Sequence, residues 1–316
     1  MDWRQLWEIC SAPDNVPIVG LIPLLIFYIY LAWRQAHAND QLIEQLETDP
    51  AMAKTHHRKT WPFKPGWQKE VHVWPFLLRI EFLAAIIVTI ILMVWSITLN
   101  APLEEPANPN LTMNPAKAPW YFLGLQEMLV YYDPWLAGVV FPGLIIVGLG
   151  AIPYIDTNPK GNGYYTLTER KAAITIFLFG FLVLWILLII IGTFLRGPNW
   201  NFFGPYEYWD LHKLEALVNV NLSEYIWVKG LHMGLPTNPL IREMFGFILI
   251  LAYFLTIPAI MAKKWFNNFY NMLGPIRYHV MMFLLLSMAA LPIKMLLRWL
   301  FNLKYIVGIP EYFFNI

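Results

Sequence analysis

Six long apolar stretches constrain the fold of this chain more than any other feature. A helix needs about 20 apolar residues to cross a hydrocarbon core of ~30 Å. We therefore predict an all-α fold, a polytopic membrane bundle of about six transmembrane helices with surface helices in the outer loops. The stretches lie at Val16–Trp33, Leu77–Thr98, Leu136–Ile155, Ala172–Leu195, Met244–Met261 and His279–Trp299.

Composition agrees with lipid as the surroundings of most of the chain. It is 58% hydrophobic, 16% aromatic and only 14% charged, whereas soluble domains carry about 25% charged residues. The net charge of +1 gives no electrostatic reason to expect a nucleic-acid partner. Cys10 is the single cysteine, which excludes an intrachain disulfide, covalent haem at a CxxCH site and an iron–sulfur cluster held by this chain alone.

Basic residues predict the orientation. The segments between spans one and two, three and four, and five and six together carry twelve lysines and arginines, and the other segments carry seven. The positive-inside rule then places both termini, and the loop between the second and third spans, on the outer side. Residues 1–15 carry one arginine against three acids, so we interpret the first span as a retained helix rather than a signal peptide. Near span ends, snorkelling explains Arg79, Lys294 and Arg298.

The loop after the second span has an unusual order of residues. A lead-in with Pro102, Pro106, Pro109 and Pro115 resists helix formation. Trp120-Tyr121-Phe122 follows, with Pro119 suited to the first helical position, and Asp133-Pro134 closes a segment of about thirteen residues, too short to cross a bilayer. Trp120, Leu123, Glu127 and Val130 share one helical stripe. We predict a short surface helix that presents aromatics and one acid inward; the alternative is a simple interfacial anchor.

The same loop resembles the quinol-oxidation loop in the C-terminal half of cytochrome b, the part called subunit IV in bf-type complexes. The family's Pro-Glu-Trp-Tyr motif corresponds here to Ala118-Pro119-Trp120-Tyr121, so that proline replaces the glutamate. The resemblance is most specific over 102–156 and extends across spans two to four. It implies one subunit, not active alone, of a bacterial cytochrome bc-type quinol:cytochrome c oxidoreductase in the inner (cytoplasmic) membrane.

That resemblance also implies cofactors and partners. Quinol would be oxidised on the outer side, with one electron passing to a Rieske iron–sulfur protein, the next to a b haem, and protons released outside. A c-type cytochrome would be a further partner. The seven histidines form no pair at helical spacing inside a span, so we expect an N-terminal-type cytochrome b subunit to ligate both b haems. They are His37, His56, His57, His72, His212, His232 and His279, of which all but His279 fall in expected loops.

The candidate site residues follow from the loop. Pro119 has no titratable group, so Glu127 is our candidate proton acceptor, with Asp133 and Glu104 in reserve. Tyr121 would position quinol. Glu127 could equally be a solvated helix charge, and Tyr121 an interfacial anchor. We expect the pocket to be bordered by Ala118, Pro119, Trp120 and Phe122, and we expect no metal ligands on this chain.

A second quinone site is expected on the inner side, at the start of the second span. Arg79 and Glu81 stand two residues apart at the membrane edge, where family members often place a charged pair. The alternative is a helix-end charge pair without a ligand.

The expected organisation has three parts. Residues 1–76 would form an extra membrane helix and a cytoplasmic loop, 77–195 the cytochrome b-like core with its loop at about 100–135, and 196–316 an outer segment and two further helices. Apolar spacing over Leu211–Leu222 predicts a surface helix. Two other classes compete: a quinol-binding anchor of another oxidoreductase, and a transporter or channel, which would need polar residues deep in its spans.

Overall fold

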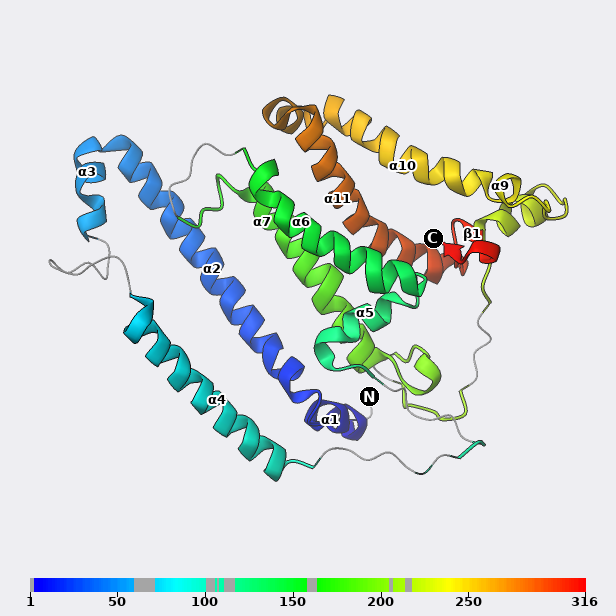
Figure 1. The fold of residues 1–316 in the computed structure, drawn as a ribbon, viewed down its shortest axis with the longest axis horizontal. Coiled ribbons are helices and arrows are strands. Elements are labelled where there is room, and N and C mark those ends of the chain that lie inside the picture. Colours follow the sequence, from blue (N-terminus) through cyan, green and yellow to red (C-terminus); the bar gives the residue numbers. More distant parts are fainter. Residues whose placement is uncertain are drawn as a thin grey trace. The chain divides into compact units, whose positions relative to one another are not determined.

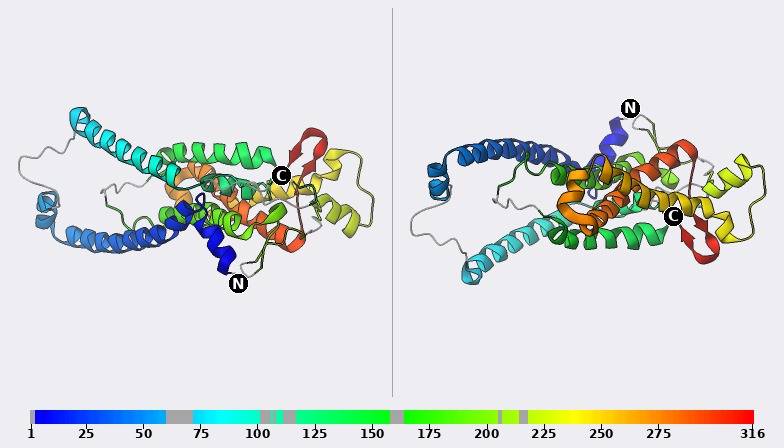
Figure 2. Two further views of the ribbon diagram at one scale, coloured as in Figure 1. Left: turned by 90° about the horizontal axis from the view of Figure 1, so that it is seen from below. Right: turned by 90° about the horizontal axis from the view of Figure 1, so that it is seen from above.

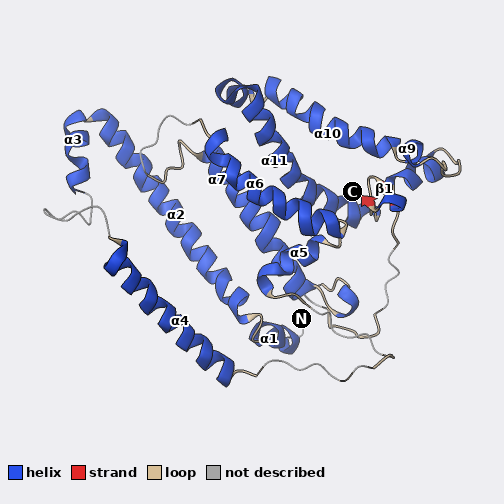
Figure 3. Cartoon of the chain, viewed as in Figure 1, coloured by secondary structure: helices blue, strands red, loops and turns tan. Residues whose placement is uncertain are grey.

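The computed structural model describes residues 3–59, 72–100, 106, 108–110, 117–157, 164–204, 207–213 and 218–316. Over these residues the chain is mostly helical (Figure 1). The sheet in this part is a single antiparallel pair, β1 (Gly308–Ile309) and β2 (Phe314–Asn315), which appears red in Figure 3. The predicted all-α, polytopic membrane fold is therefore confirmed.

Six helices in the described chain are long and apolar enough to cross a membrane, as predicted. In chain order, these spans one to six are α2 (Val16–Thr48), Val73–Leu77 with α4 (Leu78–Thr98), Leu136–Val140 with α6 (Phe141–Ile155), the run Lys171–Leu195, α10 (Met244–Lys263) and α11 (Asn267–Phe301). Span four consists of α7 (Lys171–Leu178), Phe179–Ile186, α8 (Leu187–Ile190) and Ile191–Leu195. Which side of the membrane each terminus occupies remains a prediction.

The shorter helices lie before, between and after these spans. Ordinary helical turns form α1 (Trp3–Ser11), α3 (Pro50–Lys59), α5 (Leu123–Met128) and α9 (Pro239–Arg242), and a wider helix covers Glu224–Gly230. Single 3₁₀ turns cover Trp120–Phe122, Pro198–Trp200 and Pro310–Tyr312.

Span one is longer than predicted. Its helix α2 has 33 residues, roughly 50 Å at 1.5 Å per residue, so it continues well beyond a bilayer. The continuation is rich in Ala, Gln, Leu and Glu, which favour helix, and it stops where Asp49 begins α3 by accepting hydrogen bonds from the backbone N–H groups of Ala51 and Met52. His37, His56 and His57 therefore lie in helices rather than loops, contrary to expectation.

Span six also begins earlier than predicted, but it is not one continuous helix. Gly274 has φ 75° and ψ 171° inside α11, a conformation that glycine adopts without steric cost. Pro275 follows and starts a fresh helical segment close to the predicted start of the span.

The predicted helix at Leu211–Leu222 is wrong for the residues that the structure describes there. Residues 211–213 form a turn and 218–221 are non-helical, with Val220 bridged to Leu303. The segment pairs its backbone with the chain after α11 instead, through the Val220 N–H and carbonyl groups. Helix begins only at residue 222, so tertiary pairing has overridden apolar spacing.

The chain divides into two compact units. One contains Trp7–Ala107 and Gly163–Lys171, and within it the far half of α2 holds the segment that precedes span four. Asn39 donates to the Tyr165 carbonyl at 2.9 Å, and His56 is hydrogen-bonded to the Tyr164 hydroxyl. In contrast, α4 has no buried residue.

The other unit contains Met1–Leu6, Asn108–Asn162 and Ala172–Ile316. In it α10 runs beside α11, and α6 lies along α11, as Figure 2 also shows. Tyr278 on α11 donates from its hydroxyl to the carbonyl of Pro258 in α10 at 2.9 Å, which links the two helices. The functional division at residues 76 and 195 remains a prediction.

Candidate functional site

The Trp120 loop begins as predicted but forms a shorter helix. Pro119 is extended (φ −49°, ψ 144°) and stands just before the first helical residue rather than in it. Helix covers Trp120–Phe122 and α5, ending at Met128 instead of continuing to Tyr132. Beyond that point the N–H groups of Leu129, Val130 and Tyr131 bond to carbonyls three residues back, so the last turn tightens.

That tightened turn directs two tyrosines into the core. Tyr131 and Tyr132 are 0% and 5% exposed. Burial raises the pKa of both phenols above their usual range, so both stay protonated at ordinary pH. The hydrophobic cluster around them joins the loop to spans three, four and six; its buried members are Met128, Tyr131, Tyr132, Leu136, Ala137, Leu188, Ile191, Leu291 and Met295.

The start of the loop is fixed to the end of span four. Lys117 donates from Nζ to the Thr193 carbonyl at 2.7 Å, one of the carbonyls that a helix leaves unpaired at its C-terminus. Burial lowers the pKa of Lys117 to about 8. The Ala118 N–H donates to Gln126 Oε1 at 2.7 Å, which closes the motif back onto α5. Gly192 permits close packing, since a Cβ there would come 2.9 Å from the Leu123 side chain.

Glu127 is the best-defined polar group of the loop. Its side chain is 0% exposed and accepts two hydrogen bonds from Arg196, from Nη2 to Oε1 at 2.8 Å and from Nε to Oε2 at 3.0 Å. The Tyr131 hydroxyl donates to Oε1 at 3.0 Å. A forked, charge-assisted pair of this kind fixes both groups. The interpretation of Glu127 as a solvated helix charge is therefore wrong, whereas its proposed part in proton transfer stays a prediction.

The aromatic residues of the motif lie differently from Glu127. The Trp120 ring centroid is 6.3 Å from that of Trp185 on span four, while Tyr121 and Phe122 are 49% and 52% exposed. The structure groups Trp120, Tyr121 and Phe122 through ring contacts. Within the described residues, the carboxylate of Glu127 accepts hydrogen bonds from Arg196 and Tyr131. Trp120 and Tyr121 are not among its hydrogen-bond donors.

Of the two alternative proton acceptors, Asp133 and Glu104, the structure describes the first. Asp133 is held by two donors, the Tyr305 hydroxyl at 2.6 Å and Asn315 Nδ2 at 2.9 Å. Glu104 lies outside the described residues. In the described part of the loop, Glu127 and Asp133 therefore both accept hydrogen bonds from residues outside the loop.

The expectation that Lys294 snorkels to the membrane surface is wrong. Lys294 is 2% exposed, and in the described part of the chain its Nζ has no hydrogen-bond partner. The ammonium nitrogen lies 5.7 Å from the centroid of the Tyr132 ring, a distance typical of a cation–π contact. Tyr132 of the loop thus packs against the buried Lys294 side chain and not only against apolar side chains.

The residues predicted for a second quinone site lie on α4. Arg79 and Glu81 are both exposed. Residues two apart on a helix do not face each other, so their charges point to different parts of the surroundings. Their role as a quinone site remains a prediction.

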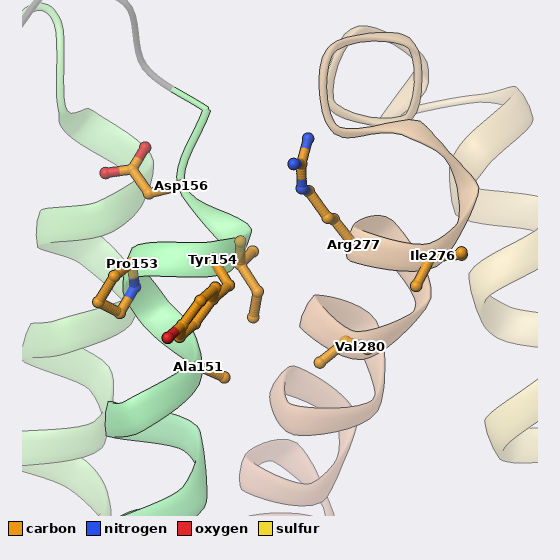
Figure 4. Close-up of a pocket in the computed structure, with 8 residues that line it drawn as sticks. Ala151, Pro153, Tyr154, Asp156, Ile276, Arg277 and Val280 are labelled. Atoms are coloured by element: carbon orange, nitrogen blue, oxygen red, sulfur yellow. The ribbon is translucent and has the colours of Figure 1, made fainter.

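A hollow of about 450 Å³ opens between the end of α6 and the start of the regular part of α11 (Figure 4). Arg277 extends into the gap from α11, whereas the Asp156 carboxylate points away from it. Tyr154 is 78% exposed, so this wall is open. The lining contains none of the predicted site residues; it consists of Ala151, Pro153, Tyr154, Ile155, Asp156, Ile276, Arg277 and Val280.

Comparisons with known proteins bear on the segment that carries this loop. Residues 106–204 match the family model described as cytochrome b(C-terminal)/b6/petD. Because of this match we call residues 106–204 the cytochrome b segment. A relative, the menaquinol:cytochrome c reductase cytochrome c subunit of Geobacillus thermodenitrificans, is 29% identical over 116 residues, 35% of this chain and 46% of the relative. No solved structure matches the chain.

The family match confirms the resemblance seen in the sequence and sets its extent. The cytochrome b segment contains spans three and four, the Trp120 loop and Arg196, but span two lies outside it. The chain matches less than half of the length of its relative. Spans one, five and six, and everything after residue 204, are additional to the matched cytochrome b segment.

Sequence reasoning missed the residues that hold the loop in place. Arg196 is one of the seven basic residues of the other segments and is not among the predicted site residues, yet it pairs with Glu127. Its position directly after an apolar run of span four was the available signal, because a charge at that depth usually has a partner. Lys117 and the tail residues Tyr305 and Asn315 gave no comparable local signal.

Proposed function

We propose that this chain is a membrane subunit of a cytochrome bc-type quinol oxidoreductase, and that its Trp120 loop forms part of the outer quinol-oxidation site. The observation that carries the proposal is that the cytochrome b segment contains a loop fixed to span four at its start and in its middle. Lys117 binds one end to span four, and Glu127 binds the middle to Arg196. Such rigidity is what a site needs to hold a substrate in one geometry.

The exposed aromatic residues of the loop and the buried Glu127 would have different roles. Tyr121 and Phe122 are half exposed and offer an aromatic surface and one hydroxyl to a ring-shaped substrate, beside Ala118, Pro119 and Trp120. We propose that Tyr121 orients the quinol by hydrogen bonding and that the open side of this surface is completed by an N-terminal-type cytochrome b subunit. That partner, rather than this chain, would ligate both b haems.

Oxidation of one quinol releases two electrons and two protons. We propose that one electron passes to a Rieske protein and the other to a low-potential b haem, with a c-type cytochrome downstream. Glu127 is our candidate for one of the protons. Its burial excludes direct contact with quinol in this conformation, so a proton would reach it through Tyr131 or a water. The carboxylate would then release part of its pair with Arg196.

The test is purification of the chain with its native complex. We expect a reduced-minus-oxidised spectrum of haem b, an electron paramagnetic resonance signal of a Rieske cluster, and quinol:cytochrome c activity. Tyr121→Phe should raise the KM for quinol about three- to tenfold, the effect of losing one hydrogen bond of about 1 kcal/mol, with the haem spectrum unchanged. Quinol oxidation without a Rieske signal would instead favour a quinol-binding anchor of another oxidoreductase.

A further inference from the structure

The chain after α11 returns to the Trp120 loop. Residues 306–316, here called the C-terminal hairpin, form the β1–β2 pair with Gly308 opposite Asn315. The hairpin closes on itself, because the Ile316 N–H donates to the Val307 carbonyl at 2.9 Å. All of it lies beyond the cytochrome b segment.

Asp133 is where the hairpin meets the loop. The Tyr305 hydroxyl donates to Oδ1 at 2.6 Å, and Asn315 Nδ2 donates to Oδ2 at 2.9 Å. Burial and the neighbouring carboxylate raise the pKa of Tyr305, so it remains a donor at ordinary pH. Each carboxylate oxygen therefore receives one hydrogen bond from a residue more than 170 positions away in the chain.

Two further contacts surround this pair. Lys304 donates from Nζ to the Val130 carbonyl at 3.1 Å, which binds the tightened turn after α5. The Phe314 ring stacks on Trp135, with centroids 5.5 Å apart and planes at 28°. The loop is thus contacted on both sides of Asp133 by the segment that follows span six.

The hairpin itself is held firmly by the start of span five. Glu243 is 1% exposed and accepts from the Gly308 N–H at 3.1 Å. Arg242 donates to both carboxylate oxygens of Glu311, at 3.0 and 3.1 Å. Gly246 admits the hairpin to α10, since a Cβ there would overlap with the Ile306 carbonyl oxygen. The hairpin is therefore a rigid support and not a loose tail.

We propose that the C-terminal hairpin, with Lys304 and Tyr305, is a positioning element for the outer quinol site, acting through Asp133 and Trp135. This inference rests on the proposed function and gives a role to spans five and six. In this proposal Asp133 orders the loop, because each of its oxygens accepts a hydrogen bond from the segment that follows span six.

The test uses paired variants in the purified complex. Tyr305→Phe removes one donor to Asp133, and Tyr312→Phe is its control, since Tyr312 is 76% exposed. Phe314→Ala removes the stack on Trp135, and Phe313→Ala is the control at a residue 84% exposed. We expect Tyr305→Phe and Phe314→Ala to raise the KM for quinol about fivefold with kcat within twofold, part of what a hydrogen bond to a charged group contributes. The controls should match wild type.

A second measurement does not depend on activity. Hydrogen exchange of the Tyr132, Leu136 and Ala137 amides, which bond to the Met128 and Asp133 carbonyls, should quicken about tenfold in Tyr305→Phe, as expected for local loosening. If exchange in Tyr305→Phe is no faster than in wild type, or if the KM of Tyr305→Phe equals that of Tyr312→Phe, the positioning role is wrong. If a variant fails to assemble, exchange in Asn315→Ser decides in the same way. A wild-type complex without quinol oxidation would contradict the proposed function, whereas exchange would still decide the role of the hairpin.

Discussion

The buried pair of Glu127 and Arg196 allows the structural and chemical roles of Glu127 to be separated. Glu127→Gln keeps the size of the side chain but leaves the Arg196 guanidinium, 8% exposed, without a counter-charge. Breaking a buried ion pair from one side costs about 3–5 kcal/mol. Arg196→Gln leaves the carboxylate unpaired, and we expect it to destabilise the chain by a similar amount.

The double variant Glu127→Gln with Arg196→Gln removes both charges and leaves two amides that can bond to each other. It should be at least about 2 kcal/mol more stable than the sum of the single effects predicts, since residues in one ion pair are strongly coupled. The assay is unfolding in mixed detergent micelles, followed by tryptophan fluorescence. Additive single effects would refute the conclusion that this pair stabilises the loop.

Turnover of the same double variant addresses proton transfer. With the fold restored but no carboxylate present, quinol oxidation should stay roughly 10²-fold slower than wild type, the low end for loss of a general base. If the double variant regains wild-type turnover, Glu127 serves only as the partner of Arg196, and Asp133 or a group on another subunit accepts the proton.

Three further predictions follow from the orientation, the histidines and Lys117. A cysteine introduced at Thr55 should resist labelling from outside intact cells, and efficient labelling would reverse the orientation predicted from the basic residues. The chain isolated from its complex should retain no stoichiometric haem b, which absorbance of the reduced protein would detect. Lys117 binds its proton less tightly in the folded state, at a pKa of about 8, than at its ordinary value of 10.5. The unfolded chain therefore holds more protons between these values, and stability should rise with pH from about 8 to 10.5 relative to Lys117→Met; a pH-independent difference would contradict this.

The membrane spans could be predicted from sequence because lipid imposes a simple rule of length and apolarity. The ends of α2 and α11 could not, because helix propensity continues α2 beyond its apolar stretch and Gly274 allows a turn inside α11. The Leu211–Leu222 helix failed for a different reason. Backbone pairing of Val220 with the chain after α11 is a long-range contact that local spacing does not contain.

Prediction of the site shows the same division. The consecutive residues Pro119, Trp120 and Tyr121 located the loop, because a short motif of neighbouring residues can be recognised in the sequence alone. The groups that fix it come from residues 193–196 and 304–316, and a local pattern does not reveal partners at that separation. The sequence indicates Glu127 because it is an acid on the helical face of Trp120. Its burial against Arg196 appears only when span four is folded beside α5.

The most direct test of the outer quinol site is photolabelling of the purified complex with a light-reactive quinol analogue. The labelled peptides would be mapped by mass spectrometry, with and without excess unmodified quinol. We predict label on Trp120, Tyr121 or Phe122, lost on competition, and unlabelled exposed aromatics at Trp3 and Trp7. If the label that excess quinol removes lies only on other subunits, and residues 117–135 are unmodified, the assignment of this loop to the quinol site is wrong.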